Sequence, residues 1–179
     1  MLSKLFRTGK RLDMLYYCLY TSDYTVTEVS RQTGVTKGLV SRFLDYLHSQ
    51  GLIEREANRF YVTNVPTTRA VKLLLNISRI EMGALHRDWL TGLGIYGSWA
   101  QGTNTLESDI DVWIKVDENP GEMELARLQN QIKEMLSSEV NTITITPEYL
   151  KTLRQDEPFF HSLIRTSYTL IGDGIEWPE

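Results

Sequence analysis

The segment from Leu93 to Ile114 constrains the fold of this chain more than any other stretch. It reads L-G-I-Y-G-S-W-A-Q-G-T-N-T-L-E-S-D-I-D-V-W-I. Apolar residues lead into Gly97-Ser98, which predicts a strand, a tight turn and then a short helical turn. Alternation from Asp109 to Ile114 predicts a second strand, and its period of two puts Asp109 and Asp111 on the same face.

This arrangement indicates a particular chemistry. A helical turn that opens at Ser98 presents backbone N–H groups that suit an anion such as a phosphate. Two neighbouring carboxylates repel each other, and a divalent cation such as Mg²⁺, which prefers oxygen ligands, relieves that repulsion. The segment therefore predicts metal-assisted nucleotidyl or phosphoryl transfer. The alternative is an ordinary hairpin with two exposed aspartates.

The pattern of Gly-Ser, ten residues and then Asp-x-Asp resembles the minimal nucleotidyltransferases of the DNA polymerase beta superfamily. The resemblance covers most of residues 90–173 and implies a mixed sheet backed by helices. It implies that Asp109 and Asp111 are catalytic and hold Mg²⁺ or Mn²⁺. It also implies that Gly97, Ser98 and Gln101 bind a nucleoside triphosphate, with ATP as the expected one.

Two positions depart from that family. A third carboxylate usually lies on the strand that corresponds to V-N-T-I-T-I-T-P-E, and the matching residue here is Asn141. Neutral asparagine is a poor general base, so Glu139, two residues earlier, is the candidate substitute. The family commonly has a basic residue where this chain has Gln101. The departures predict either altered chemistry or nucleotide binding without efficient turnover.

The front of the chain, residues 1–64, has the pattern of three helices and a hairpin. Thr25-x-x-Glu28 predicts a capping box, Gly34 a helix end, and Thr36 the cap of the third helix. Asn58 separates two short strand-like runs. The run from Thr25 to Ile53 resembles a winged helix-turn-helix domain.

That resemblance implies a DNA-reading surface. In winged helices the third helix enters the major groove with its N-terminal residues at base edges, and the wing contacts phosphates or the minor groove. Residues 1–63 carry nine Lys/Arg against six Asp/Glu, while the rest of the chain carries ten against seventeen. A module used only for protein contacts or dimerisation is the alternative. The candidate DNA-binding residues are Thr36, Lys37, Gly38, Ser41, Arg42, Arg55 and Arg59.

Residues 65–92 form the predicted connector, and residues 93–179 the nucleotidyltransferase domain. Pro66 stands where a helix could begin, and apolar residues then recur too often for one narrow stripe. We expect one long helix with Gly83 as a possible break. The helix is a candidate homodimer element, and an internal core helix is an equal alternative.

The expected fold class is α+β: a winged helix-turn-helix followed by a polymerase-beta-like core of mixed sheet and helices. The absence of a long apolar run predicts no membrane association, and the single Cys18 fits the core of a helix in a reducing cytoplasm.

Three functional hypotheses follow from the sequence. The first is a Mg-dependent nucleotidyltransferase that moves a nucleoside monophosphate to an unknown acceptor and is coupled to a DNA-binding winged helix. The second is a DNA-binding transcriptional regulator whose nucleotidyltransferase-like domain senses nucleotide or a partner with little turnover. The third is a toxin–antitoxin component with a small helical partner.

Overall fold

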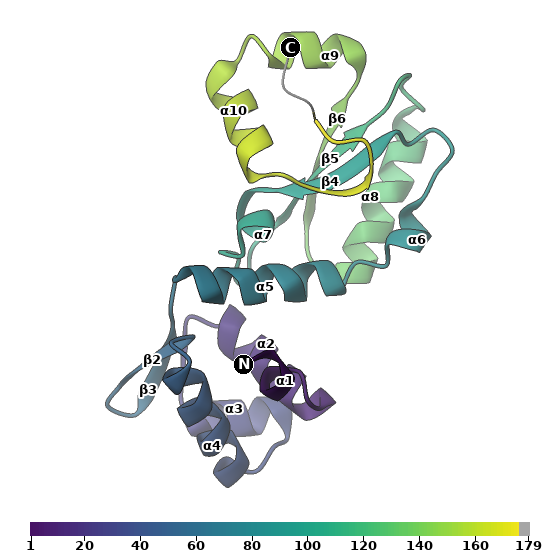
Figure 1. Cartoon of the computed structure of the whole chain (residues 1–179). Coiled ribbons are helices and arrows are strands. Elements are labelled where there is room, and N and C mark those ends of the chain that lie inside the picture. Colours follow the sequence, from purple (N-terminus) through teal and green to yellow (C-terminus); the bar gives the residue numbers. More distant parts are fainter. Residues whose placement is uncertain (176–179) are drawn as a thin grey trace. The chain divides into compact units, whose positions relative to one another are not determined.

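The computed structural model describes residues 1–175, without the side chain of Glu157, and divides the chain into two compact units. The first unit contains Met1–Leu75 and the short segment Thr103–Leu106. The second contains Asn76–Gly102 and the described residues from Glu107 onward. Helices and strands are mixed in each unit, which confirms the expected α+β class (Figure 1).

The first unit has the elements of a winged helix. A three-stranded antiparallel sheet in the order β1-β3-β2 lies beside a helical cluster. The helix α5 begins in this unit and ends in the next. The elements of the first unit are α1 (Leu2–Leu5), α2 (Gly9–Tyr20), β1 (Asp23–Tyr24), α3 (Val26–Thr33), α4 (Lys37–Ser49), β2 (Ile53–Glu56), β3 (Arg59–Val62) and the start of α5 (Pro66–Ser78).

The predicted boundaries of α3 are confirmed. The Thr25 hydroxyl accepts from the Glu28 N–H at 3.3 Å, and the Glu28 carboxylate accepts from the Thr25 N–H at 2.7 Å. Gly34 ends the helix in the left-handed conformation. Thr36 precedes α4 as expected, but its side chain makes no cap hydrogen bond, so that half of the prediction is wrong.

The wing also corrects the sequence prediction. Asp23–Tyr24 is a two-residue strand that pairs with β3, and no signal in the sequence predicts it. Within the predicted hairpin, Ala57, with φ of 52°, adopts the positive φ of the turn. The N-terminal residues form the short helix α1, which buries Leu5.

Leucines and aromatic side chains from α1, α2, α4 and the sheet form the core of the first unit. Cys18 is fully buried among them, as expected. Burial raises the pKa of the Cys18 thiol to about 12 and also raises the pKa of the neighbouring Tyr24 hydroxyl. The thiol is therefore unreactive at neutral pH and acts as a small apolar residue.

The second unit is built on a four-stranded mixed sheet in the order β6-β5-β4-β7. β5 runs parallel to β6, while β4 is antiparallel to β5 and β7. Its elements are α6 (Met82–Leu85), β4 (Gly92–Tyr96), α7 (Gly97–Gln101), β5 (Ile110–Lys115), α8 (Glu122–Leu136), β6 (Val140–Ile145), α9 (Pro147–Leu153), α10 (Glu157–Thr166) and β7 (Tyr168–Gly172).

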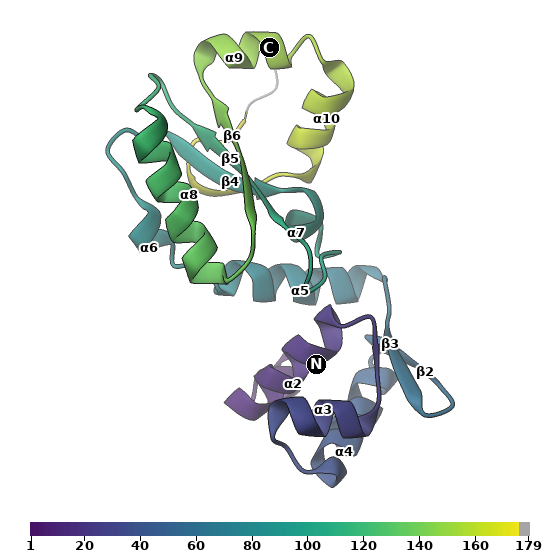
Figure 2. The same cartoon turned by 180° about the vertical axis from the view of Figure 1, so that it is seen from behind.

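Helices cover both faces of this sheet (Figures 1 and 2). Helix α8 packs Leu128, Ile132 and Leu136 against one face. Helices α9 and α10 pack against the other face around the fully buried Trp113. Two independent apolar layers therefore hold β5 at the centre, where its side chains are fixed by packing on both sides.

The connector is two helices rather than one. Helix α5 starts at Pro66 as predicted but ends at Ser78, and α6 begins at Met82. Gly83 lies inside α6, so it is not the break. Across the described part of the chain, none of the helices combines the length and apolar character that a bilayer crossing requires.

Candidate functional site

The bend after β4 brings backbone and carboxylate together. Tyr96, the last residue of β4, pairs in register with Asp111 of β5. Gly97 then turns the chain into α7 with φ of 64°. A Cβ atom on Gly97 would lie 2.5 Å from Oδ2 of Asp111. Glycine is favoured at this position, because a side chain would push the Asp111 carboxylate aside and would strain the left-handed backbone.

The two aspartates lie on one side of the sheet and share a neighbour. Asn141 of β6 stands opposite Asp111 in the parallel register. Its Nδ2 atom donates to Oδ2 of Asp109 at 3.5 Å and to Oδ1 of Asp111 at 3.4 Å. The contact of one amide with both carboxylates requires that Asp109 and Asp111 face the same point.

The other candidate site residues differ in their surroundings. The Glu139 carboxylate accepts from the Lys133 ammonium of α8 at 2.7 Å and is exposed. Ser98 is half-buried in the first turn of α7, and Gln101 is exposed at its end. Asn141, rather than Glu139, is thus the polar group in contact with the two aspartates.

The donor set fits a hard divalent cation. Asp109 and Asp111 supply carboxylate oxygens, and the Asn141 amide has a carbonyl oxygen that a turn of its terminal group would present. Among residues 1–175, no group of three or more His, Cys, Asp or Glu gathers as a metal site. Mg²⁺ usually takes one or two carboxylates and completes its shell with water and phosphate oxygens, so the two aspartates suffice.

Tyr96 is a site residue that the sequence did not single out. Burial raises the pKa of its hydroxyl, with smaller contributions from the negative charge of Asp111 and from Tyr149. Because Tyr96 pairs in register with Asp111, its half-buried ring lies beside that residue. In the sequence Tyr96 is only an apolar residue before Gly97. Its position opposite Asp111 follows from the pairing of β4 with β5.

Part of the loop between Gly97 and Asp109 is held by hydrogen bonds that the sequence did not predict. Its segment Thr103–Leu106 belongs to the first unit. The Leu106 N–H donates to the Tyr20 carbonyl at 3.2 Å. The buried Lys72 ammonium donates to the Asn104 carbonyl and lies 4.9 Å from the centroid of the Tyr20 ring. Desolvation lowers the pKa of Lys72 to about 8.

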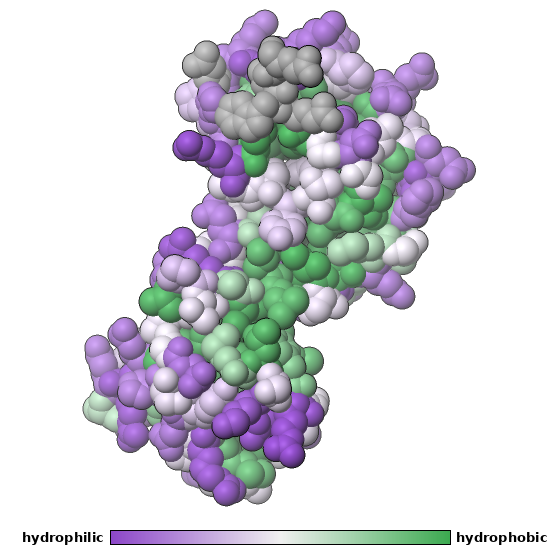
Figure 3. Space-filling view, viewed as in Figure 1, coloured by the Kyte–Doolittle hydropathy of each residue, from purple (hydrophilic) through white to green (hydrophobic). Residues whose placement is uncertain are grey.

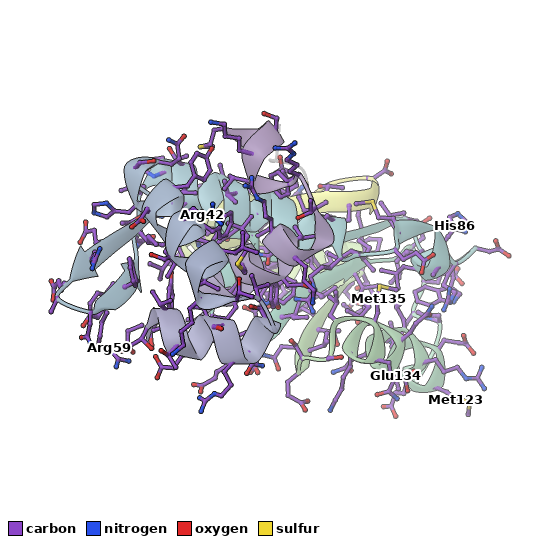
Figure 4. All side chains as sticks on the ribbon, turned by 90° about the horizontal axis from the view of Figure 1, so that it is seen from below. Arg42, Arg59, His86, Met123, Glu134 and Met135 are labelled. Carbon is purple, nitrogen blue, oxygen red and sulfur yellow. The ribbon has the colours of Figure 1, made fainter. Side chains whose placement is uncertain are left out.

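The candidate DNA-reading residues stand at the start of α4 and on the wing. Figure 4 shows Arg42 on α4 and Arg59 at the hairpin, and in Figure 3 hydrophilic residues gather over that hairpin. The Arg59 guanidinium is paired with Asp23, and the Arg55 guanidinium lies over the Phe60 ring at 5.5 Å. Ser41 is half-buried, while the exposed candidates at the start of α4 are Thr36, Lys37, Gly38 and Arg42.

The fold and this geometry define a two-domain protein, with a winged helix before a nucleotidyltransferase-type sheet. Comparison with known families agrees. Residues 81–164 match the model of the nucleotidyltransferase domain, and residues 8–59 match that of the MarR family. The chain thus carries a nucleotidyltransferase domain and a MarR-type winged-helix domain.

Solved structures of low identity also match part of the chain. One is a toxin–antitoxin complex with AMP-PNP: 20% identity, 61% of this chain and 75% of that chain covered, TM-score 0.37. Another is a tri-AMPylated Shewanella oneidensis HEPN toxin with MNT antitoxin: 16% identity, 56% and 73% covered, TM-score 0.38. No curated protein is similar enough in sequence to count as a match.

Proposed function

We propose that the chain is a nucleotidyltransferase that moves a nucleoside monophosphate from a nucleoside triphosphate, with ATP as the expected one, to an acceptor hydroxyl. The observation that carries the proposal is the meeting of the Gly97 bend with the Asp111 carboxylate, beside Asp109 and Asn141. A glycine bend that leaves no room for a side chain next to paired carboxylates suits a bound polyphosphate and its cation.

The proposed roles follow from the positions. The backbone at Gly97 and Ser98 binds phosphate oxygens, and Asp109 with Asp111 holds Mg²⁺ or Mn²⁺, which when bound would offset the phosphate charge. The acceptor oxygen forms a bond to the α-phosphorus while the bond to the pyrophosphate oxygen breaks. The acceptor proton goes to water or to the released pyrophosphate, because neutral Asn141 is a poor base.

Transfer of label from α-labelled ATP tests this proposal. Purified protein is incubated with Mg²⁺ and candidate acceptors: its own chain, co-purified proteins and nucleic acids. We expect label transfer that Asp109→Asn and Asp111→Asn abolish. Asp117→Asn is the matched control, because this exposed aspartate follows β5 and lies outside the site. Equal transfer by all four proteins would contradict the proposal.

We also propose that the winged helix binds double-stranded DNA, which makes a regulator with a nucleotide-sensing domain the second candidate function. The observations that favour it are the exposed start of α4 and the neutral residues Asn141 and Gln101 in the nucleotide site. Both neutral residues are expected to slow turnover more than binding.

If the winged helix binds DNA, two arginines of the first unit should contribute differently to the affinity. If Arg42 contacts a base, Arg42→Ala should weaken binding to the DNA upstream of the protein's own gene by about 1–3 kcal/mol. Arg59→Ala should weaken it less, because Asp23 already pairs with that guanidinium. Fluorescence anisotropy at two salt concentrations, with and without Mg-ATP, gives both affinities. Arg127→Ala in α8 controls for loss of one positive charge.

Equal affinity of the wild-type protein and Arg42→Ala for this DNA would remove α4 as the reading helix. Operator binding without any label transfer would favour the regulator over the enzyme. The homodimer and the small helical toxin partner stay predictions, and co-purification from the native host tests both.

A further inference from the structure

The side-chain amide of Asn141 donates hydrogen bonds to both Asp109 and Asp111. The parallel pairing of β5 and β6 sets Asn141 opposite Asp111. The two donor distances are nearly equal, 3.5 Å to Asp109 and 3.4 Å to Asp111. An amide nitrogen carries two protons, so it serves two acceptors without adding charge.

The electrostatic consequence concerns the protein before any cation binds. Two carboxylates that face one point repel each other. Within the described chain neither Asp109 nor Asp111 forms an ion pair, and Lys133 is paired with Glu139. The Asn141 amide is a polar side chain whose protons offset this repulsion. An aspartate at the same place would add a third negative charge instead.

We propose that Asn141 is a positioning residue that keeps the Asp109 and Asp111 carboxylates together without a bound cation and limits the site to one divalent cation. The metal ligation rests on the proposed function, whereas the role in the metal-free protein does not. With a cation bound, the Asn141 amide would present its carbonyl oxygen, which coordinates more weakly than a carboxylate. One divalent cation would balance the two negative charges of Asp109 and Asp111, and neutral Asn141 adds no further charge to hold a second.

The first test compares thermal unfolding in EDTA and in Mg²⁺. Asn141→Asp should lower Tm in EDTA by about 2–4 °C, the shift that a loss of roughly 1 kcal/mol gives in a protein of this size. Mg²⁺ should raise the Tm of both proteins, because it binds the folded state, and the rise should be larger in Asn141→Asp, where it also offsets the added charge. The matched control is Asn130→Asp, the same substitution at an exposed position of α8.

The second test counts bound Mn²⁺ by electron paramagnetic resonance, without nucleotide. We expect one Mn²⁺ per wild-type chain and two per Asn141→Asp chain. Asn141→Ala, which removes the donor and adds no charge, should lower Tm in EDTA by less than Asn141→Asp does. It keeps the test available if the aspartate variant does not fold.

The outcomes distinguish this inference from the proposed function. Equal Tm for wild type, Asn141→Ala and Asn141→Asp in EDTA, or two Mn²⁺ in the wild type, would overturn the role of Asn141. If the Tm differences in EDTA appear but the wild type neither binds Mn²⁺ nor transfers label, the positioning role stands. In that case the metal stoichiometry and the proposed function both fail.

Discussion

The winged helix and the nucleotidyltransferase sheet depend on different kinds of contact. In the winged helix the decisive features are local: the capping box at Thr25 and Glu28, the left-handed Gly34 and the hairpin of β2 and β3. In the sheet they join residues far apart in the chain, as Asn141 meets Asp109 across 32 positions. The winged helix is therefore specified mostly by residues close in the sequence, and the candidate nucleotide site by the register of the strands.

The largest predicted effect tests the register directly. Gly97→Ala should abolish Mg-ATP binding, because the new Cβ would lie 2.5 Å from the Asp111 carboxylate. Gly34→Ala is the matched control: Gly34 also has a left-handed backbone, with φ of 66°, but no atom lies within 4 Å of its Cβ position. Both variants carry a backbone strain of about 1–2 kcal/mol, so only loss of binding separates them.

Titration calorimetry with a non-hydrolysable ATP analogue measures that difference, and circular dichroism confirms that both variants fold. Similar affinities for Gly97→Ala and Gly34→Ala would contradict the claim that the register of β4 and β5 defines the site.

The second prediction concerns Lys72, because its ammonium binds the carbonyl of Asn104, a residue 32 positions away in the chain. The folded protein releases the Lys72 proton near pH 8, while the unfolded chain keeps it to about 10.5. Between these values the unfolded state binds more protons, so the free energy of unfolding rises with pH. The rise amounts to at most about 1.4 kcal/mol per pH unit.

Urea unfolding of wild type and Lys72→Met at pH 7 and pH 9.5 checks this. The difference in unfolding free energy, wild type minus variant, should be larger at pH 9.5, since the buried charge is then lost. An unchanged difference would show that Lys72 is solvated and that its bond to Asn104 does not hold the ammonium out of water.

The smallest effect concerns two threonines that the sequence treats alike. Thr25→Ala should lower stability by about 1 kcal/mol, because its hydroxyl caps α3. Thr36→Ala should change it by less than about 0.5 kcal/mol, because its hydroxyl makes no cap bond to α4. Thermal unfolding of both variants measures the stability that each one loses. Equal losses of stability would mean that capping by Thr25 and by Thr36 does not differ.

The part of the fold that follows from local signals could be predicted from the sequence. The capping box, Gly34 and the strand on either side of the glycine bend all appear as expected. These signals act within a few residues, so the sequence alone contains them.

Features that arise from distant pairing were missed. Strand β1 has two residues and exists only because β3 lies beside it. The helix break at residues 79–81 has no glycine or proline to announce it. The hydrogen bond from Lys72 to Asn104 and the pairing of Tyr96 with Asp111 require the tertiary fold. Asn141 was expected near the aspartates from the family resemblance, not from periodicity.

The most direct measurement is the affinity of the protein for an ATP analogue, with Mg²⁺ and with EDTA, in wild type and Asp111→Asn. The account predicts saturable binding by the wild type that weakens at least tenfold, about 1.4 kcal/mol, when Mg²⁺ is removed. Asp111→Asn should lose that dependence on Mg²⁺, while Asp117→Asn keeps it. Equal dependence on Mg²⁺ in wild type and Asp111→Asn would contradict the claim that the carboxylate pair beside the glycine bend binds the nucleotide's cation.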